Sequence, residues 1–116
     1  MKRLQDFKGN EAIVTAARVL GVMIDILKHP KNAEMKGEQN GVVMFTTFMQ
    51  NTPEKMMEIF AILSEKDPAE YTCDGTEALL NMMVLANDPI IMSLFISQGQ
   101  KRDATSSGSA SENTEA

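Results

Sequence analysis

GNEAIVTAARVLGVMIDILKHP, residues 9–30, carries the clearest helical pattern in the chain. Apolar side chains recur in it every three or four residues, a spacing that places them on one face of an α-helix. We expect a helix from Glu11 to Lys28, with Asn10 as its N-cap and with Pro30 preventing its continuation. The residues expected to face the core are Ile13, Ala16, Ala17, Leu20, Met23, Ile24 and Leu27.

The segments that follow are more ambiguous. Residues 31–40 are polar and predict no more than a short helical turn. GVVMFTTFMQ, residues 41–50, has the β-branched and aromatic content of a strand. However, Val42, Phe45 and Phe48 also fit one helical face, and helical neighbours would leave a single strand without a pairing partner. We therefore predict a helix here.

Three start signals predict the remaining helices. TPE at 52–54 combines a hydroxyl cap, a proline at the first helical position and an acid in the first turn. DGTE at 74–77 has the spacing of a capping box. NDP at 87–89 repeats the pattern of a cap followed by proline. The helices predicted from these signals span residues 53–65, 76–86 and 90–97.

The last apolar residues, Leu94 to Ile96, are followed by a run of Ser, Thr, Gly, Ala and charged residues. A segment with so little apolar surface cannot offset the entropy lost on ordering, so we expect it to be disordered. The predicted fold is all-α. It is a compact bundle of four to five short helices over residues 1–98, with a disordered Ser/Thr/Gly/Ala-rich tail over residues 99–116.

Charge and composition argue against several partners. The chain of 116 residues has a net charge of −5, and its Lys and Arg residues are scattered. Nucleic acid and anionic membranes attract clustered basic residues, so neither is expected as a partner. The longest uncharged stretch, residues 39–53, is too short and polar to span a bilayer. We also see no signal peptide, and therefore expect a soluble, cytosolic protein.

Catalytic and metal-binding patterns are missing from the sequence. His29 is the only histidine and Cys73 the only cysteine, whereas a zinc site needs about three or four ligands. The acidic surroundings of Cys73 should keep its thiol protonated. The carboxylates of residues 67–77 do not have the spacing of a calcium loop. We therefore expect no catalytic residue, no metal and no cofactor, and do not expect an enzyme.

The chain resembles the small tail assembly chaperones of long-tailed phages and prophages of Gram-positive bacteria. The resemblance extends over nearly the whole chain, from MKRLQDFKGNEA at the start to SASENTEA at the end. Its most recognisable parts are the Glu-Tyr pair after a helix, NDP leading into a final helix, and LFISQGQ at residues 94–100. None of these parts is a catalytic signature.

The resemblance implies a function and a set of partners. Such chaperones coat the tape measure protein, a long helical chain that sets tail length, and keep it soluble in the host bacterial cytoplasm until the tail tube forms. They are absent from the mature particle. In many members a frameshift adds a second domain that is thought to recruit tail tube protein, and residues 99–116 would then be its flexible linker. Self-association remains open.

Ten methionines are the outlier in the composition. They could simply fill a helical core, or they could form an adaptable binding surface, because the thioether side chain is flexible and polarizable. Coating a long helix needs an apolar groove that tolerates varied side chains. The residues predicted to line such a partner-binding groove are Phe45, Met49, Met56, Met57, Met83 and Phe95.

Two other classes of protein remain as alternatives. The main alternative is a small structural virion protein, such as a head–tail connector or a tail completion protein, which would stay in the finished particle. A small helical DNA-binding regulator is the other. The acidic composition and the lack of a basic recognition helix argue against that regulator.

Overall fold

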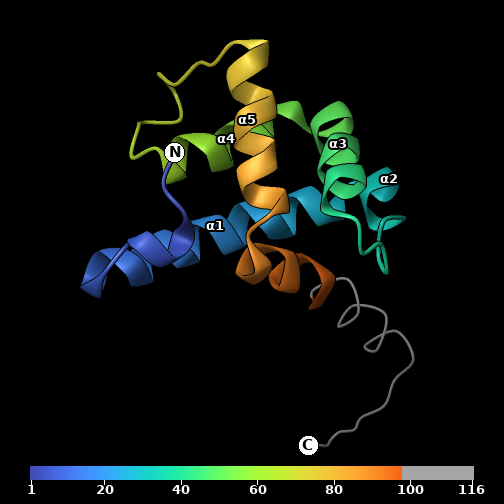
Figure 1. The fold of residues 1–116 in the computed structure, drawn as a ribbon, viewed down its shortest axis with the longest axis horizontal. Coiled ribbons are helices and arrows are strands. Elements are labelled where there is room, and N and C mark those ends of the chain that lie inside the picture. The colour runs from blue at the N-terminus through green and yellow to red at the C-terminus, as the bar shows by residue number, and fades with distance from the viewer. Residues whose placement is uncertain (98–116) are drawn as a thin grey trace, which may run out of the picture.

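The computed structural model describes residues 1–97, which fold into helices and connecting turns without any strand. In chain order the elements are the 3-10 helix η1 (Leu4–Asp6), α1 (Gly9–Lys28), α2 (Pro30–Ala33), α3 (Gly41–Asn51), α4 (Pro53–Leu63), α5 (Gly75–Ala86) and a last helix, Pro89–Ser97 (Figure 1). The predicted all-α fold class is confirmed, including a helix rather than a strand at α3. The predicted disordered tail lies outside the described residues.

The helices cross one another rather than running in parallel. α1 is the longest and extends along the back of the view in Figure 1, while α5 stands across it at the front. α1 packs against α4, and α3 packs against both α4 and α5. The last helix bends away from α5 by 76°. Helices distant in sequence therefore share one core.

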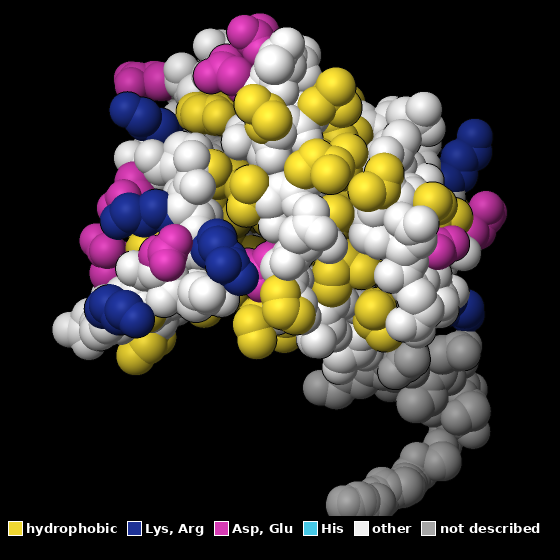
Figure 2. Space-filling model, in the orientation of Figure 1, with side chains coloured by type: hydrophobic (Ala, Val, Ile, Leu, Met, Phe, Trp, Pro, Cys, Tyr) yellow, Lys and Arg dark blue, Asp and Glu magenta, His cyan; other side chains and the backbone are white. Residues whose placement is uncertain are grey.

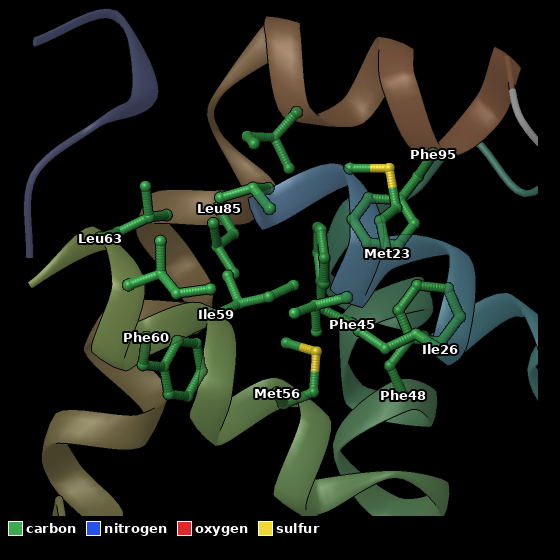
Figure 3. Packing of buried hydrophobic residues seen from close by; sticks show 14 of the residues in the cluster. Met23, Ile26, Phe45, Phe48, Met56, Ile59, Phe60, Leu63, Leu85 and Phe95 are labelled. Atoms are coloured by element: carbon green, nitrogen blue, oxygen red, sulfur yellow. The ribbon is translucent and has the colours of Figure 1, made fainter. Parts of the chain in front are cut away.

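An aromatic cluster forms the centre of that core. The ring of Phe95, from the last helix, lies 5.2 Å from the rings of both Phe45 and Phe48 in α3 (Figure 3). The Phe45 pairs are edge to face, an arrangement that the ring quadrupoles favour. In α4, Met56 and the residues from Ile59 to Leu63 are buried beside this cluster.

The two later start signals work as predicted. Asp74 and Glu77 form a capping box at α5: the Glu77 N–H donates to Asp74 Oδ1 (2.8 Å) and the Asp74 N–H donates to Glu77 Oε1 (3.0 Å). Asp88 Oδ1 accepts from the N–H of Ile90 (2.9 Å) at the start of the last helix. Thr52 precedes α4, but its hydroxyl donates to Phe48 O (2.9 Å) instead of capping α4.

The predicted orientation of α1 is partly wrong. Its buried residues are Thr15, Val19, Val22, Met23, Ile26 and Leu27. Ile13 and Ile24, expected in the core, are 70% and 39% exposed, and Ala16 and Ala17 are exposed as well. The reason is that apolar residues cover more than half of the circumference of this helix, so two faces compete for burial. The N-cap is Lys8, and Asn10 lies inside the first turn.

Candidate functional site

His29 and Cys73 are the two side chains at which metal or thiol chemistry would be sought. Within residues 1–97 no three His, Cys, Asp or Glu side chains gather as metal ligands would. His29 Nδ1 accepts from the Lys31 N–H (3.2 Å) and so caps α2. Burial, followed by the charges of Glu77 and Asp74, raises the pKa of the Cys73 thiol. This direction agrees with the expected protonated thiol, although burial contributes more to it than the acidic neighbours do.

The predicted groove does not form as expected. Phe45, Met56 and Phe95 are at most 3% exposed and belong to the core, so they line no open surface. The reason for Phe45 and Phe95 is that their rings complete the aromatic cluster. Met49 and Met57 are half-buried, and the Met57 sulfur lies 3.6 Å from the Cys73 sulfur. Of the six residues only Met83 is largely open, with 43% of its surface exposed.

Two other apolar surfaces are exposed instead. The first, called here the α1 surface, consists of the outward-facing residues Ile13, Val14, Ala17, Gly21 and Ile24. They lie within about a third of the helix circumference, because each residue turns an α-helix by about 100°. Ile13 and Val14 are 70% and 57% exposed, well beyond what a core-facing residue shows.

The centre of the α1 surface is low and its ends are raised. Ala17 and Gly21 occupy the middle, between Ile13 and Ile24. A Cβ atom at Gly21 would meet nothing within 4 Å, so the space above it is open. An open hollow of about 560 Å³ begins at Val14, at the edge of this surface, but most of its lining is polar or charged, with Asn10, Glu11, Thr15 and Arg18 from α1 and Glu65 to Asp67 beyond it. The surface can therefore receive another element along the helix.

The second exposed surface, called here the α5 surface, consists of Leu79, Leu80, Met83 and the half-buried Val84. Figure 2 shows hydrophobic side chains gathered over α5 and toward α3 on this face of the molecule. Leu79 and Leu80 are 58% and 61% exposed. Contiguous apolar patches of this kind mark interaction sites more often than scattered single residues do.

The sequence contained a signal for both surfaces. Assigning the apolar residues of each helix to a single buried face overlooked it. On α1, Val14 and the pair Val19 and Val22 fall outside the predicted stripe, which shows that a single stripe cannot contain all the apolar residues. On α5, Leu79 and Leu80 add to the apolar residues Ala78, Met82 and Leu85, so the apolar residues again cover more than one face of the helix. An excess of apolar residues over one helical face therefore indicates an exposed surface.

No family model, no curated protein and no solved structure matches this chain. Among the described residues, no single helix is long and apolar enough to cross a membrane. Only the bent pair of α5 and the last helix satisfies the criteria of length and composition when taken together.

Proposed function

We propose that this protein is a tail assembly chaperone of long-tailed phages or prophages. It binds the tape measure protein in the host bacterial cytoplasm and keeps it soluble until the tail tube forms. The identification rests on the sequence resemblance. The structural observation that best supports it is the exposed α1 surface, since folded domains rarely leave so many large apolar side chains open without a partner.

The shape of the α1 surface suits a helical partner. A helix of 20 residues is about 30 Å long, so α1 offers an extended contact rather than a small pocket. Helices pack about 8–10 Å apart when the ridges of one fit the grooves of the other. The small residues Ala17 and Gly21 permit that close approach, and Ile13 and Ile24 supply apolar contacts on either side.

The rest of the proposal follows the family resemblance. A longer frameshifted product would carry a second domain after residues 99–116 and recruit tail tube protein. The chaperone would leave before the particle is complete. No catalytic group, metal or cofactor has a role in this function, because binding and release of an apolar helix involve no bond chemistry.

The direct test is a double substitution on the α1 surface. Ile13→Glu with Ile24→Glu places two charges on the proposed contact, and co-expressed tape measure protein should then move from the soluble fraction to the pellet. A pull-down should lose the complex in parallel. The matched control is Gln5→Glu with Gln50→Glu, which adds the same charge at exposed positions outside the surface. Equal solubility with both variants would contradict the proposed contact.

A second experiment separates the chaperone from the structural alternative. Mass spectrometry of purified mature particles should detect the tape measure and tube proteins but not this chain. Its presence in a fixed ratio to the tube protein would instead identify a virion component, such as a connector or completion protein.

A further inference from the structure

The hollow of about 560 Å³ opens along one edge of the α1 surface. Val14 belongs to both the hollow and the surface, and Arg18 lies four residues further along the same side of α1. The opposite wall is the segment 65–68, which follows α4 and lies on the same side of the molecule as the first half of α1 (Figure 1). A helix placed on the α1 surface therefore extends over this hollow with the residues on its flank.

The hydroxyl of Thr15 is a buried polar group in this hollow. Thr15 is 6% exposed, and its hydroxyl forms no hydrogen bond within residues 1–97. A helical threonine commonly donates to the carbonyl oxygen four residues earlier, as Thr47 does to Val43 O (3.0 Å). Buried polar groups normally have a partner, so the Thr15 hydroxyl is a donor that a ligand can use.

Two cations reach the same hollow. Arg18 and Lys66 both line it, and neither forms an ion pair in the part of the chain that the structure describes. The backbone holds Lys66 at the wall, because its N–H donates to Ala61 O (2.9 Å) in the turn that ends α4. Arg18 is exposed on α1, and its guanidinium presents a planar set of donors that matches a carboxylate.

The acidic residues of the hollow already have partners. Glu65 Oε2 lies 2.9 Å from Lys2 Nζ. The hydrogen bond to Glu65 and the charge of Glu65, followed at a distance by the charge of Glu11, raise the pKa of Lys2. Asp67 Oδ1 accepts from the Ala69 N–H (2.9 Å) within the turn. Among the described residues, the two cations and the buried hydroxyl are therefore the groups that remain for a ligand.

We infer that this hollow binds one carboxylate, from a glutamate or aspartate on the flank of a helix that lies along the α1 surface. The inference rests on the proposed function, which places a partner helix there. Arg18 and Lys66 neutralise the carboxylate, and the Thr15 hydroxyl donates to one of its oxygens. An acidic residue beside the apolar stripe of the partner thus sets the register in which that helix lies on α1.

The lining favours a single negative charge over a phosphate group. Glu11, Glu65 and Asp67 line the hollow beside the two cations, so a doubly charged group would be repelled. A partner helix with an apolar residue at this position would cover Arg18 and the Thr15 hydroxyl without pairing them, which costs affinity. The site therefore selects among apolar helices instead of accepting all of them.

A coupling experiment with peptides tests the carboxylate. Overlapping labelled peptides of about 25 residues that cover the tape measure protein are titrated with the full chain, and binding is followed by fluorescence anisotropy. In the peptide that binds most tightly, each Glu and Asp is replaced in turn by Gln or Asn. One replacement should weaken binding by about fivefold, and it should have no effect on binding to the Arg18→Gln chain. If no acidic position is coupled to Arg18 in this way, the inference is wrong.

A charge reversal distinguishes a failure of this inference from a failure of the proposed function. Arg18→Glu should weaken peptide binding by about tenfold. Lys31→Glu, the same change of charge at an exposed position on α2, should leave binding unaltered. Binding that is lost with Ile13→Glu and Ile24→Glu but unchanged by Arg18→Glu would overturn only the inference. If no peptide binds, the proposed function fails and the inference fails with it.

Thr15→Val separates the role of the hydroxyl in binding from its role in the fold. The substitution removes a buried polar group that has no partner within residues 1–97, so the melting temperature of the free chain should not fall. Peptide binding should nevertheless weaken by about threefold, because the carboxylate loses a hydrogen bond. Thr15→Ser keeps the hydroxyl and should keep the affinity. Unchanged affinity with Thr15→Val would remove the hydroxyl from the proposed site.

Discussion

The side chain of Asn32 is fully buried and connects three parts of the fold. Its Nδ2 donates to Ile26 O (2.9 Å) at the end of α1 and to Thr52 Oγ1 (3.0 Å) between α3 and α4. Its Oδ1 accepts from Asn51 Nδ2 (3.1 Å). A buried amide is tolerated only when its hydrogen bonds are made, so these bonds fix how α2 docks on its neighbours.

Asn32→Ala should therefore destabilise the fold strongly. The substitution removes three hydrogen bonds and leaves partners in the interior without water, which we expect to cost about 2–4 kcal/mol. Asn51→Ala, at a half-buried position, removes only one of these bonds and should cost about 1 kcal/mol. Urea unfolding followed by circular dichroism measures both. Equal losses would show that Asn32 has no special role.

The sequence did not reveal this network. Residues 31–40 have a polar composition, which predicts a surface turn, and nothing local distinguishes Asn32 from Asn40. Asn40 does act locally, since its side chain accepts from the N–H groups of Val42 and Val43 and caps α3. The burial of Asn32 depends on Ile26 and Thr52, which only the tertiary structure brings beside it.

Gly41 and Gly21 both lie in helices, but the space around them differs. Gly41 begins α3, where a Cβ atom would lie 2.9 Å from both the Ala86 carbonyl oxygen and the Met92 sulfur. α3 can therefore approach the end of α5 and the last helix only because this residue has no side chain. Gly21, in the middle of α1, has open space instead.

Alanine at these two positions should have opposite effects. Gly21→Ala should raise the free energy of unfolding by about 0.5–1 kcal/mol, because alanine loses less backbone entropy in a helix. Gly41→Ala should lower it, since the clash with the backbone of Ala86 outweighs the same gain in helix propensity. Thermal unfolding of both variants shows whether each substitution raises or lowers the stability. A stabilised Gly41→Ala would mean that α3 and α5 can separate at little cost.

At the scale of elements, helix starts were more predictable than helix faces. The capping box of α5 and the Asp88 cap of the last helix depend on residues three or fewer positions apart, so sequence alone identifies them. Which face of α1 is buried depends on α4, which packs against it. For the same reason the predicted groove included Phe45 and Met56, whose burial depends on helices distant in the sequence.

The core of the molecule contains residues from both ends of the described chain. Phe7 precedes α1, and Ile91 and Phe95 lie in the last helix, yet all three are buried in one cluster. Residues 99–116 contain few apolar side chains, so their composition gives them little to add to this cluster. Deleting the tail and deleting the last helix should therefore have very different effects.

A chain that ends at Ser97 should unfold at nearly the same temperature as the full chain. A chain that ends at Asn87 loses Ile91 and Phe95 from the core. At about 3–5 kcal/mol for a large buried side chain, that loss approaches the stability of a typical small domain. Thermal melts by circular dichroism compare the two. A cooperative melt of the shorter chain near the temperature of the full chain would contradict this account.

The contribution of Phe95 also sets the timing of folding during protein synthesis. The ribosome releases the chain from its N-terminus, so Phe45 and Phe48 emerge long before the ring that packs against both of them. Until then a nascent chain has an unfinished aromatic cluster that can adhere to other proteins. Chains that stop before Phe95 should therefore be prone to aggregation, and the domain should close only once the last helix has left the ribosome.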